Sequence, residues 1–245
     1  MRSYRALVVF QIKGLLREPL SLFFNLIFPS FFLQFIVFMS TAFTPAGTPV
    51  GFVVSSVFTG MLGLVLGQLS LNTLPVATSA MREQGILRRF KASPMAPSTW
   101  IAAQISAYFI MALASAGLML LTASVSYELE PPAHVGALLL AFTVSAGAFL
   151  SFGYLIASLA KNPRTSMIAG QLLYMVMMFL SGVFVPVTSL PDSLQTFVQL
   201  LPMTHVIELL QAVWFDRGWP LTATGALLVT SVVSGTIAVR SFRWD

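Results

Sequence analysis

Long runs of uncharged, mostly apolar residues alternate along this chain with short polar segments. Six of these runs are long enough to cross a bilayer as α-helices. They cover residues 20–40, 50–81, 98–127, 131–160, 165–185 and 218–239. The second run exceeds what a bilayer requires, so we expect its helix to tilt or to extend beyond the membrane. The pattern therefore predicts an all-α membrane protein with six transmembrane helices.

Individual residues inside these runs predict local features of the helices. Pro29 and Pro75 lie within the first two runs and predict kinks there. Gly63 and Gly67 lie four residues apart and predict a close contact with a neighbouring helix.

The composition of the chain excludes several other classes of protein. Charged residues make up 9% of the chain and apolar residues 57%, whereas soluble proteins carry roughly 25% charged residues. A β-barrel would need alternating segments of about ten residues, and these runs are longer and continuously apolar. No segment brings together a pair of acids, a set of metal ligands or a nucleophile with a histidine. We therefore expect neither an enzyme nor a metal site.

The basic residues predict the orientation of the chain in the membrane. The net charge is +5, but the cations lie at the ends of the apolar runs, so we expect no nucleic-acid partner. With six spans and a cytosolic N-terminus, every lysine and arginine except Arg217 falls on the cytosolic side. A seventh span at residues 193–214 would instead place Arg240 and Arg243 outside. We therefore expect six spans with both termini in the cytosol.

Residues 1–18 predict an interfacial helix on the cytosolic leaflet of the lipid bilayer. Its basic residues fall within one sector of a helical wheel and would face anionic headgroups. These residues are Arg2, Arg5, Lys13 and Arg17. Glu18 and Pro19 indicate a break before the first span. The alternative is a simple continuation of that span.

Residues 186–217 predict an outer re-entrant helical hairpin between spans five and six. The segment is short for a span and is interrupted by Pro202, while His205, Glu208 and Gln211 recur on one helical face. We expect one or two short helices that lie in the membrane surface or dip into it. The hairpin could be a lid over an exit or a structural plug between helices.

The polar insert between the second and third runs is the strongest candidate for a functional site. It holds four of the thirteen basic residues of the chain within ten positions. Glu83 precedes its cations, which suits a helix dipole, and three apolar residues supply a face for burial in a partner. The predicted docking residues are Arg82, Glu83, Gly85, Ile86, Leu87, Arg88, Arg89, Phe90 and Pro94. The alternative is an ordinary loop whose cations only set the topology.

Taken in order, these features resemble the ABC-2 type transporter permeases, and in particular the drug-resistance branch of these bacterial exporters. Three segments carry the resemblance. The first, similar to the coupling helix of the family, is Glu83-Gln84-Gly85-Ile86-Leu87 with Pro94. The second, similar to its short cytosolic turn, is Lys161-Asn162-Pro163-Arg164. The third, similar to its outer hairpin, is Ser181-Gly182-Val183-Phe184-Val185-Pro186 with Leu201-Pro202-Met203-Thr204-His205. Glu83 is one position closer to the glycine than is typical, and Gln211 stands where many relatives have arginine.

The resemblance implies that this chain is one single transmembrane domain, residues 1–245, in the cytoplasmic membrane of a bacterium. It would move a hydrophobic or amphipathic substrate, such as a drug or lipid, out of the cell. A separate ATPase subunit, present in two copies, would bind ATP and magnesium and dock on the coupling segment, residues 82–97. A second permease protomer, identical or different, would complete the dimer. The sequence has no Gly-x-x-x-x-Gly-Lys-Ser/Thr loop, so we expect this chain to bind no nucleotide.

The polar and aromatic residues within the spans are candidates for the substrate path. They are Phe31, Gln34, Phe35, Gln68, Asn72 and Gln171. The alternative for the amides is hydrogen bonding between helices, and for the phenylalanines simple packing.

Two other functions remain open. One is a non-transporting membrane sensor or scaffold that recruits a soluble partner through residues 82–97. The other is a gradient-driven transporter, against which the lack of intramembrane acids argues.

Overall fold

The protein is described by a computed structural model, which places residues 2–43, 49–91, 97–127, 129, 131–183 and 191–242. Within these residues every regular element is a helix, as the apolar runs predict. The elements are α1 (Arg2–Arg17), α2 (Pro19–Leu22), the π-helical turn η1 (Phe23–Ile27), α3 (Phe28–Phe43), α4 (Val50–Gly67), the π-helical turn η2 (Gln68–Thr73), α5 (Leu74–Glu83), α6 (Ile86–Lys91), α7 (Pro97–Ser126), α8 (Val135–Leu159), α9 (Pro163–Leu180), α10 (Asp192–Val198), α11 (Pro202–Trp214) and α12 (Leu221–Ser241).

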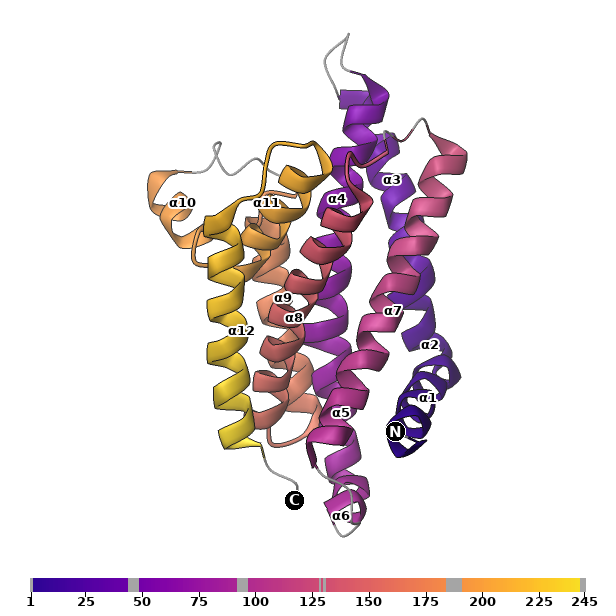
Figure 1. Ribbon diagram of the computed structural model, residues 1–245, viewed down its shortest axis with the longest axis vertical. Helices are drawn as coiled ribbons and strands as arrows, with labels where there is room; N and C mark the ends of the chain where they lie inside the picture. The colour runs from indigo at the N-terminus through magenta and orange to yellow at the C-terminus, as the bar shows by residue number, and fades with distance from the viewer. Residues whose placement is uncertain are drawn as a thin grey trace.

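The long helices run side by side in one bundle (Figure 1). The helices α1 and α6 and the C-terminal end of α12 lie at one end of the bundle, and α10 lies near the other (Figure 1). The first end carries most of the cations of the described residues, and we call it the basic end. Its cations are Arg5, Lys13, Arg17, Arg82, Arg88, Arg89, Lys161, Arg164 and Arg240. The charge asymmetry predicted from the sequence is therefore present in the fold.

Five helical stretches of the described chain are long and apolar enough to cross a membrane. They are Pro19–Ala42, Val50–Glu83, Ser98–Ser126, Val135–Leu159 and Leu221–Ser241. These stretches match five of the six predicted spans, and the second, at 34 residues, is the long one. The helix at the remaining position, α9, is less apolar because its 18 residues include Pro163, Arg164 and Gln171. The six-span count therefore stays a prediction.

Each π-helical turn lies just before a proline of the same transmembrane stretch. The turn η1 precedes Pro29, and η2 precedes Pro75. Proline has no N–H, so it cannot donate to the carbonyl four residues earlier, and the backbone around it must pair differently. In η2, the Leu74 N–H donates to the carbonyl of Leu69, five residues back, which is the π-helical pattern. A π-helical irregularity therefore accompanies each proline, while the predicted kinks stay a prediction.

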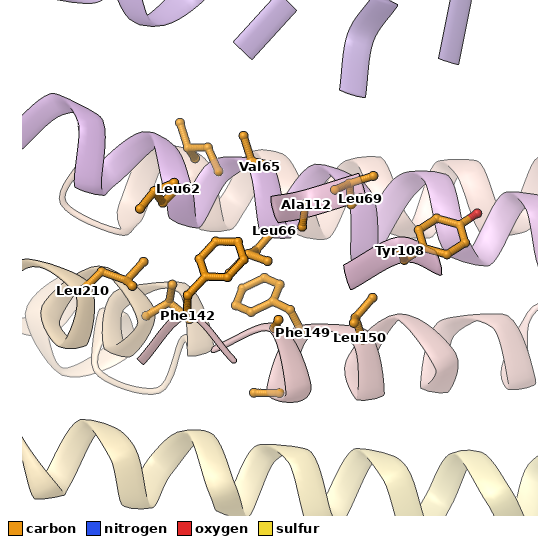
Figure 2. Packing of buried hydrophobic residues seen from close by; sticks show 14 of the residues in the cluster. Leu62, Val65, Leu66, Leu69, Tyr108, Ala112, Phe142, Phe149, Leu150 and Leu210 are labelled. Atoms are coloured by element: carbon orange, nitrogen blue, oxygen red, sulfur yellow. The ribbon is translucent and has the colours of Figure 1, made fainter. Parts of the chain in front are cut away.

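The core lies where α4, α8 and α11 meet. Phe142 and Phe149 of α8 point into the space beside Leu62 and Leu66 of α4, and all four side chains are buried (Figure 2). Burying aromatic side chains of this size contributes packing that aliphatic residues alone would not fill. This contact holds the second and fourth predicted spans together.

The glycines of α4 let α11 approach closely. A Cβ atom at Gly63 would lie 3.2 Å from Ile207, and one at Gly67 would lie 2.6 Å from the terminal methyl of Met203. The close contact predicted at these glycines is therefore confirmed. The helix α11 is packed into the bundle, since Met203 and Val206 are fully buried. Of the one or two short helices predicted, two are present as α10 and α11, while residues 186–190 of the predicted hairpin lie outside the described residues.

The first helix is separate from the first span, as predicted. α1 ends at Arg17, Glu18 is extended, and α2 begins at Pro19. One face of α1 packs on α7, and the Tyr4 hydroxyl lies 2.6 Å from the Ser106 Oγ in a hydrogen bond. The opposite face is exposed and mixes cations with apolar side chains. These are Arg5, Lys13, Arg17, Val9, Phe10 and Leu16.

Candidate functional site

The polar insert forms the end of α5, a tight turn and the short helix α6. The Gln84 N–H donates to the Ala80 carbonyl at 3.0 Å, and the Gly85 N–H donates to the Arg82 carbonyl at 2.9 Å. Gly85 has a φ of +69°, a left-handed conformation that ends α5 and lets the chain turn into α6. α6 lies at the tip of the basic end (Figure 1). Pro94 and the rest of residues 92–96 lie outside the described residues.

The predicted docking residues separate into an exposed group and an internal group. Glu83, Arg88 and Arg89 are exposed, and Gly85, Ile86 and Phe90 are partly buried. The accessible part of the segment therefore offers one carboxylate, two guanidinium groups and the edges of Ile86 and Phe90. Leu87 and Arg82, in contrast, are 0% and 8% exposed, so their side chains belong to the interior of this chain.

Arg82 joins α5 to the end of α8. Its Nη2 donates to the Ala157 carbonyl at 2.8 Å and its Nη1 to the Ala160 carbonyl at 3.0 Å. Carbonyls at the C-terminus of a helix lack intrahelical donors and carry its negative dipole end, so a cation is favourable there. The guanidinium also lies 5.6 Å from the ring centre of Phe242, just beyond α12, in a cation–π contact.

Side-chain hydrogen bonds tie α5 to two further helices, α9 and α7, and tie α7 in turn to α8. The Ser79 Oγ lies 2.6 Å from the Ser166 Oγ of α9. The Gln104 Nε2 of α7 donates to the Thr78 Oγ1 at 3.1 Å, and the Gln104 Oε1 accepts from the Tyr154 hydroxyl of α8 at 2.5 Å. Because buried hydrogen bonds of this kind are costly to break, α5 and the base of α6 are held firmly against the bundle.

Two glycines pack closely against η2, the segment that precedes α5. A Cβ atom on Gly153 of α8 would overlap the carbonyl oxygen of Ser70, and one on Gly170 of α9 would overlap that of Leu71. Both carbonyls belong to η2. Pro75 lies five residues after Ser70 and four after Leu71, and because it has no N–H it donates to neither carbonyl. The two glycines thus let α8 and α9 meet the irregular backbone directly. The Thr73 Oγ1 of η2 donates to the Asn25 Oδ1 of η1 at 3.0 Å, which links the two π-helical turns.

The candidate substrate-path residues fall in three places. Gln68 and Asn72 lie together in η2, where the Asn72 Nδ2 donates to the Gln68 Oε1 at 3.0 Å. Phe31 and Phe35 are on the exposed side of α3, near the partly buried Gln34, while Gln171 is on the exposed side of α9. This hydrogen bond lies within one element, so it is not the bond between helices that the sequence left open as an alternative.

The hairpin residues stabilise the turn between α10 and α11. Pro202 begins α11, and the His205 Nε2 lies 2.8 Å from the Gln199 carbonyl in a hydrogen bond. The His205 Nδ1 lies 3.8 Å from a carboxylate oxygen of Glu208 on the same helical face. These contacts fix the start of α11.

Comparison with known proteins identifies a family with this arrangement. The sequence profile of the ABC-2 type transporter family matches residues 2–215, which include the polar insert and both short helices. The chain belongs to the ABC-2 type transporter family. Membership agrees with the fold, in which several apolar helices form one bundle.

Curated relatives of this ABC-2 chain share moderate to low identity with it. Nodulation protein J of Bradyrhizobium diazoefficiens is 33% identical over 97 residues, which is 39% of this chain and 37% of that protein. The probable multidrug ABC transporter permease YbhR of Escherichia coli K12 is 26% identical over 200 residues, or 78% of this chain and 52% of YbhR. The chain thus spans about half the length of YbhR and less of nodulation protein J.

The left-handed turn of the ABC-2 chain predicts a sharp difference between two substitutions of Gly85. Gly85→Asn should leave α6 in place, because asparagine tolerates a positive φ, whereas Gly85→Val should displace it at a cost of about 1–2 kcal/mol. Limited trypsin digestion at Arg88 and Arg89 reports the position of α6. We expect faster cleavage in the valine variant alone, and equal rates in both variants would refute this role of the turn.

Proposed function

We propose that this chain is the membrane-spanning permease subunit of an ATP-binding-cassette exporter. One observation carries the proposal: an amphipathic helix, α6, lies at the tip of the basic end and follows the second span after the tight turn at Gly85. A helix placed in this way can be pushed by a soluble partner and can pass that motion into the membrane. The exposed Glu83 at the end of α5 and the exposed Arg88 and Arg89 of α6 offer charges of both signs to a docking cleft.

In this proposal the chain crosses the membrane six times, with α9 as the fifth span and both termini in the cytosol. The basic end then faces the cytosol, in accord with the positive-inside rule. α1 lies on the inner leaflet, and its exposed cations and apolar side chains suit an interfacial helix. α10 and α11 then form the outer hairpin, with α11 dipping into the bundle.

The energy for transport comes, in this proposal, from two copies of a separate ATPase that bind ATP and magnesium. Movement of α6 would reach α5, and from there α7, α8 and α9 through the hydrogen bonds of Ser79, Thr78 and Arg82. The π-helical turns η1 and η2 lie next along this route, and turns of this kind are frequent at functional sites. They would be the points at which the first two spans change shape.

A second permease protomer completes the proposed transporter. The exposed Phe31, Phe35 and Gln171 would line a route that forms between protomers, and Gln68 and Asn72 would support it from within. A lining of aromatic and amide groups suits a hydrophobic or amphipathic substrate. The name of the Escherichia coli relative, a probable multidrug ABC transporter permease, supports export of a drug-like molecule.

The test is a mild-detergent pull-down of the tagged permease, comparing the wild type with Arg88→Glu/Arg89→Glu. The wild type should recover a Walker-motif ATPase, and the double variant should recover at least about tenfold less, since reversing exposed charges at an interface opposes docking. Arg164→Glu is the matched control, because it reverses an exposed cation of the same end outside α6. Recovery of a soluble partner without Walker motifs would contradict the exporter and favour the sensor or scaffold.

A further inference from the structure

A cavity of about 470 Å³ opens at the basic end, between the ends of α8 and α12. The last residues of α8, the turn that follows it and the last turn of α12 form its walls. Its polar lining consists of Arg82, Lys161, Arg240, Ser158 and Ser241, and the ring of Phe242 completes it. None of the predicted docking residues except Arg82 lines this cavity, so it is distinct from the exposed face of α6.

The charges around the cavity select an anion. Three cations line it, and no aspartate or glutamate is among its described lining residues. Arg82 donates to the carbonyls of Ala157 and Ala160, so we assign it no direct contact with the ligand. Lys161 and Arg240 are exposed at the mouth and are available to a ligand. Opposite charges attract more strongly in such a partly enclosed site than in bulk water.

The surroundings of the cavity indicate that the anion is part of a lipid. Leu159, on the cavity wall, is 63% exposed, and Val239, next to Arg240, is 72% exposed. Large aliphatic side chains exposed beside a cationic cavity at the end of membrane helices offer a surface to acyl chains. A free phosphate would make no use of that surface. Basic pockets between helices on the cytosolic side are known to hold anionic headgroups.

We propose that this cavity binds the phosphate of an anionic phospholipid from the inner leaflet, held by Lys161 and Arg240. The proposal rests on the proposed function only in its orientation, which places the basic end at the inner leaflet. The bound lipid would lie against Phe242 and Arg82 and would brace the base of the coupling segment.

The experiment uses the full-length permease in detergent and counts bound lipids by native mass spectrometry. Phosphatidylglycerol, phosphatidylcholine and inorganic phosphate are the three probes. Lys161→Gln/Arg240→Gln removes the two cations at the mouth, and Arg164→Gln removes an exposed cation of the same cytosolic turn that does not line the cavity. Ser241→Glu is a second variant, which adds an acid to the cavity wall without removing either cation.

The wild type should retain phosphatidylglycerol in preference to phosphatidylcholine, and Arg164→Gln should behave in the same way. The double variant should bind phosphatidylglycerol about 30-fold more weakly, which corresponds to about fivefold for each surface cation. Ser241→Glu should weaken binding in the same direction. Equal losses in Arg164→Gln and the double variant, or competition of phosphatidylglycerol by millimolar inorganic phosphate, would overturn the proposal of a lipid site.

Recovery of the ATPase from the same preparations separates this proposal from the proposed function. If the ATPase co-purifies while phosphatidylglycerol binds no better than phosphatidylcholine, the lipid site is wrong and the exporter stands. If phosphatidylglycerol binds selectively and no ATPase is recovered, the lipid site stands and the exporter is wrong.

Discussion

Gly153→Ala should destabilise the permease by at least about 3 kcal/mol, the upper range for overpacking a tight interior. The added Cβ would overlap the carbonyl oxygen of Ser70, which is a backbone atom and cannot rotate away as a side chain could. Either α8 must move away from η2 or the π-helical turn must rearrange. Both changes would disturb the hydrogen bonds of α5 close by, so we expect transport to be lost together with stability.

Gly147→Ala is the matched control because it lies in the same helix and has open space around its position. In a helix, alanine is preferred over glycine by about 1 kcal/mol, so this variant should be as stable as the wild type or slightly more so. Thermal unfolding of the purified protein in detergent measures the difference, which should be about 10 °C for Gly153→Ala. Gly170→Ala should behave like Gly153→Ala, since its Cβ would overlap the Leu71 carbonyl. Melting temperatures within about 2 °C for Gly153→Ala and Gly147→Ala would show that η2 yields easily.

The helices could be predicted from the sequence because the length of an apolar run and the positions of charges can be read directly along the chain. Five of the predicted spans, the break at Glu18 and Pro19, and the two short helices α10 and α11 all appear in the fold. The fifth span was harder to assess, since α9 begins with Pro163 and Arg164 and carries Gln171 at its centre. Both Arg164 and Gln171 are exposed in this chain, so packing within it does not account for them.

The direction of the side chains in the polar insert was harder to predict. The sequence indicated Arg82 and Leu87 as docking residues together with their neighbours, but both are buried in this chain. The reason is geometric: α5 continues into the bundle, and the left-handed Gly85 then turns α6 to a new direction. Helical periodicity within residues 82–91 cannot reveal where neighbouring helices end. The carbonyls of Ala157 and Ala160, which receive Arg82, are 75 or more positions away along the chain.

The close packing of Gly153 and Gly170 on η2 was also not predicted, although the sequence contains a signal for it. Pro75 predicted a kink in the second span, and Gly153 and Gly170 are among several glycines of the fourth and fifth predicted spans. A proline in one helix frees carbonyl groups, and glycines elsewhere are the residues that allow a close backbone approach. Which glycines meet which carbonyls depends on the packing of three helices, and no local pattern contains that information.

Arg82→Met should lower the stability of the permease and leave its binding of the proposed ATPase nearly unchanged. The variant keeps a long apolar side chain but removes two hydrogen bonds from a charged donor, each of which contributes about 1.5–3 kcal/mol. The carbonyls of Ala157 and Ala160 would lose their cation at the end of α8. We therefore expect a loss of at least about 3 kcal/mol and a melting temperature lower by about 10 °C. Arg82→Lys should recover only part of this loss, because an ammonium group cannot reproduce the planar fork of arginine.

Arg88→Met provides the opposite pattern, because Arg88 is exposed on α6 while Arg82 is internal. We expect Arg88→Met to melt like the wild type, since a surface cation contributes less than about 1 kcal/mol to stability. Arg88→Met should recover less ATPase in a pull-down. Arg82→Met should recover an amount within about twofold of the wild type when equal amounts of folded protein are compared, because this variant retains the exposed docking charges. ATP-driven transport in vesicles should nevertheless fail in Arg82→Met, because movement of α6 would no longer reach the end of α8. A wild-type melting temperature for Arg82→Met would refute the structural role of this arginine, and intact transport would refute its role in coupling.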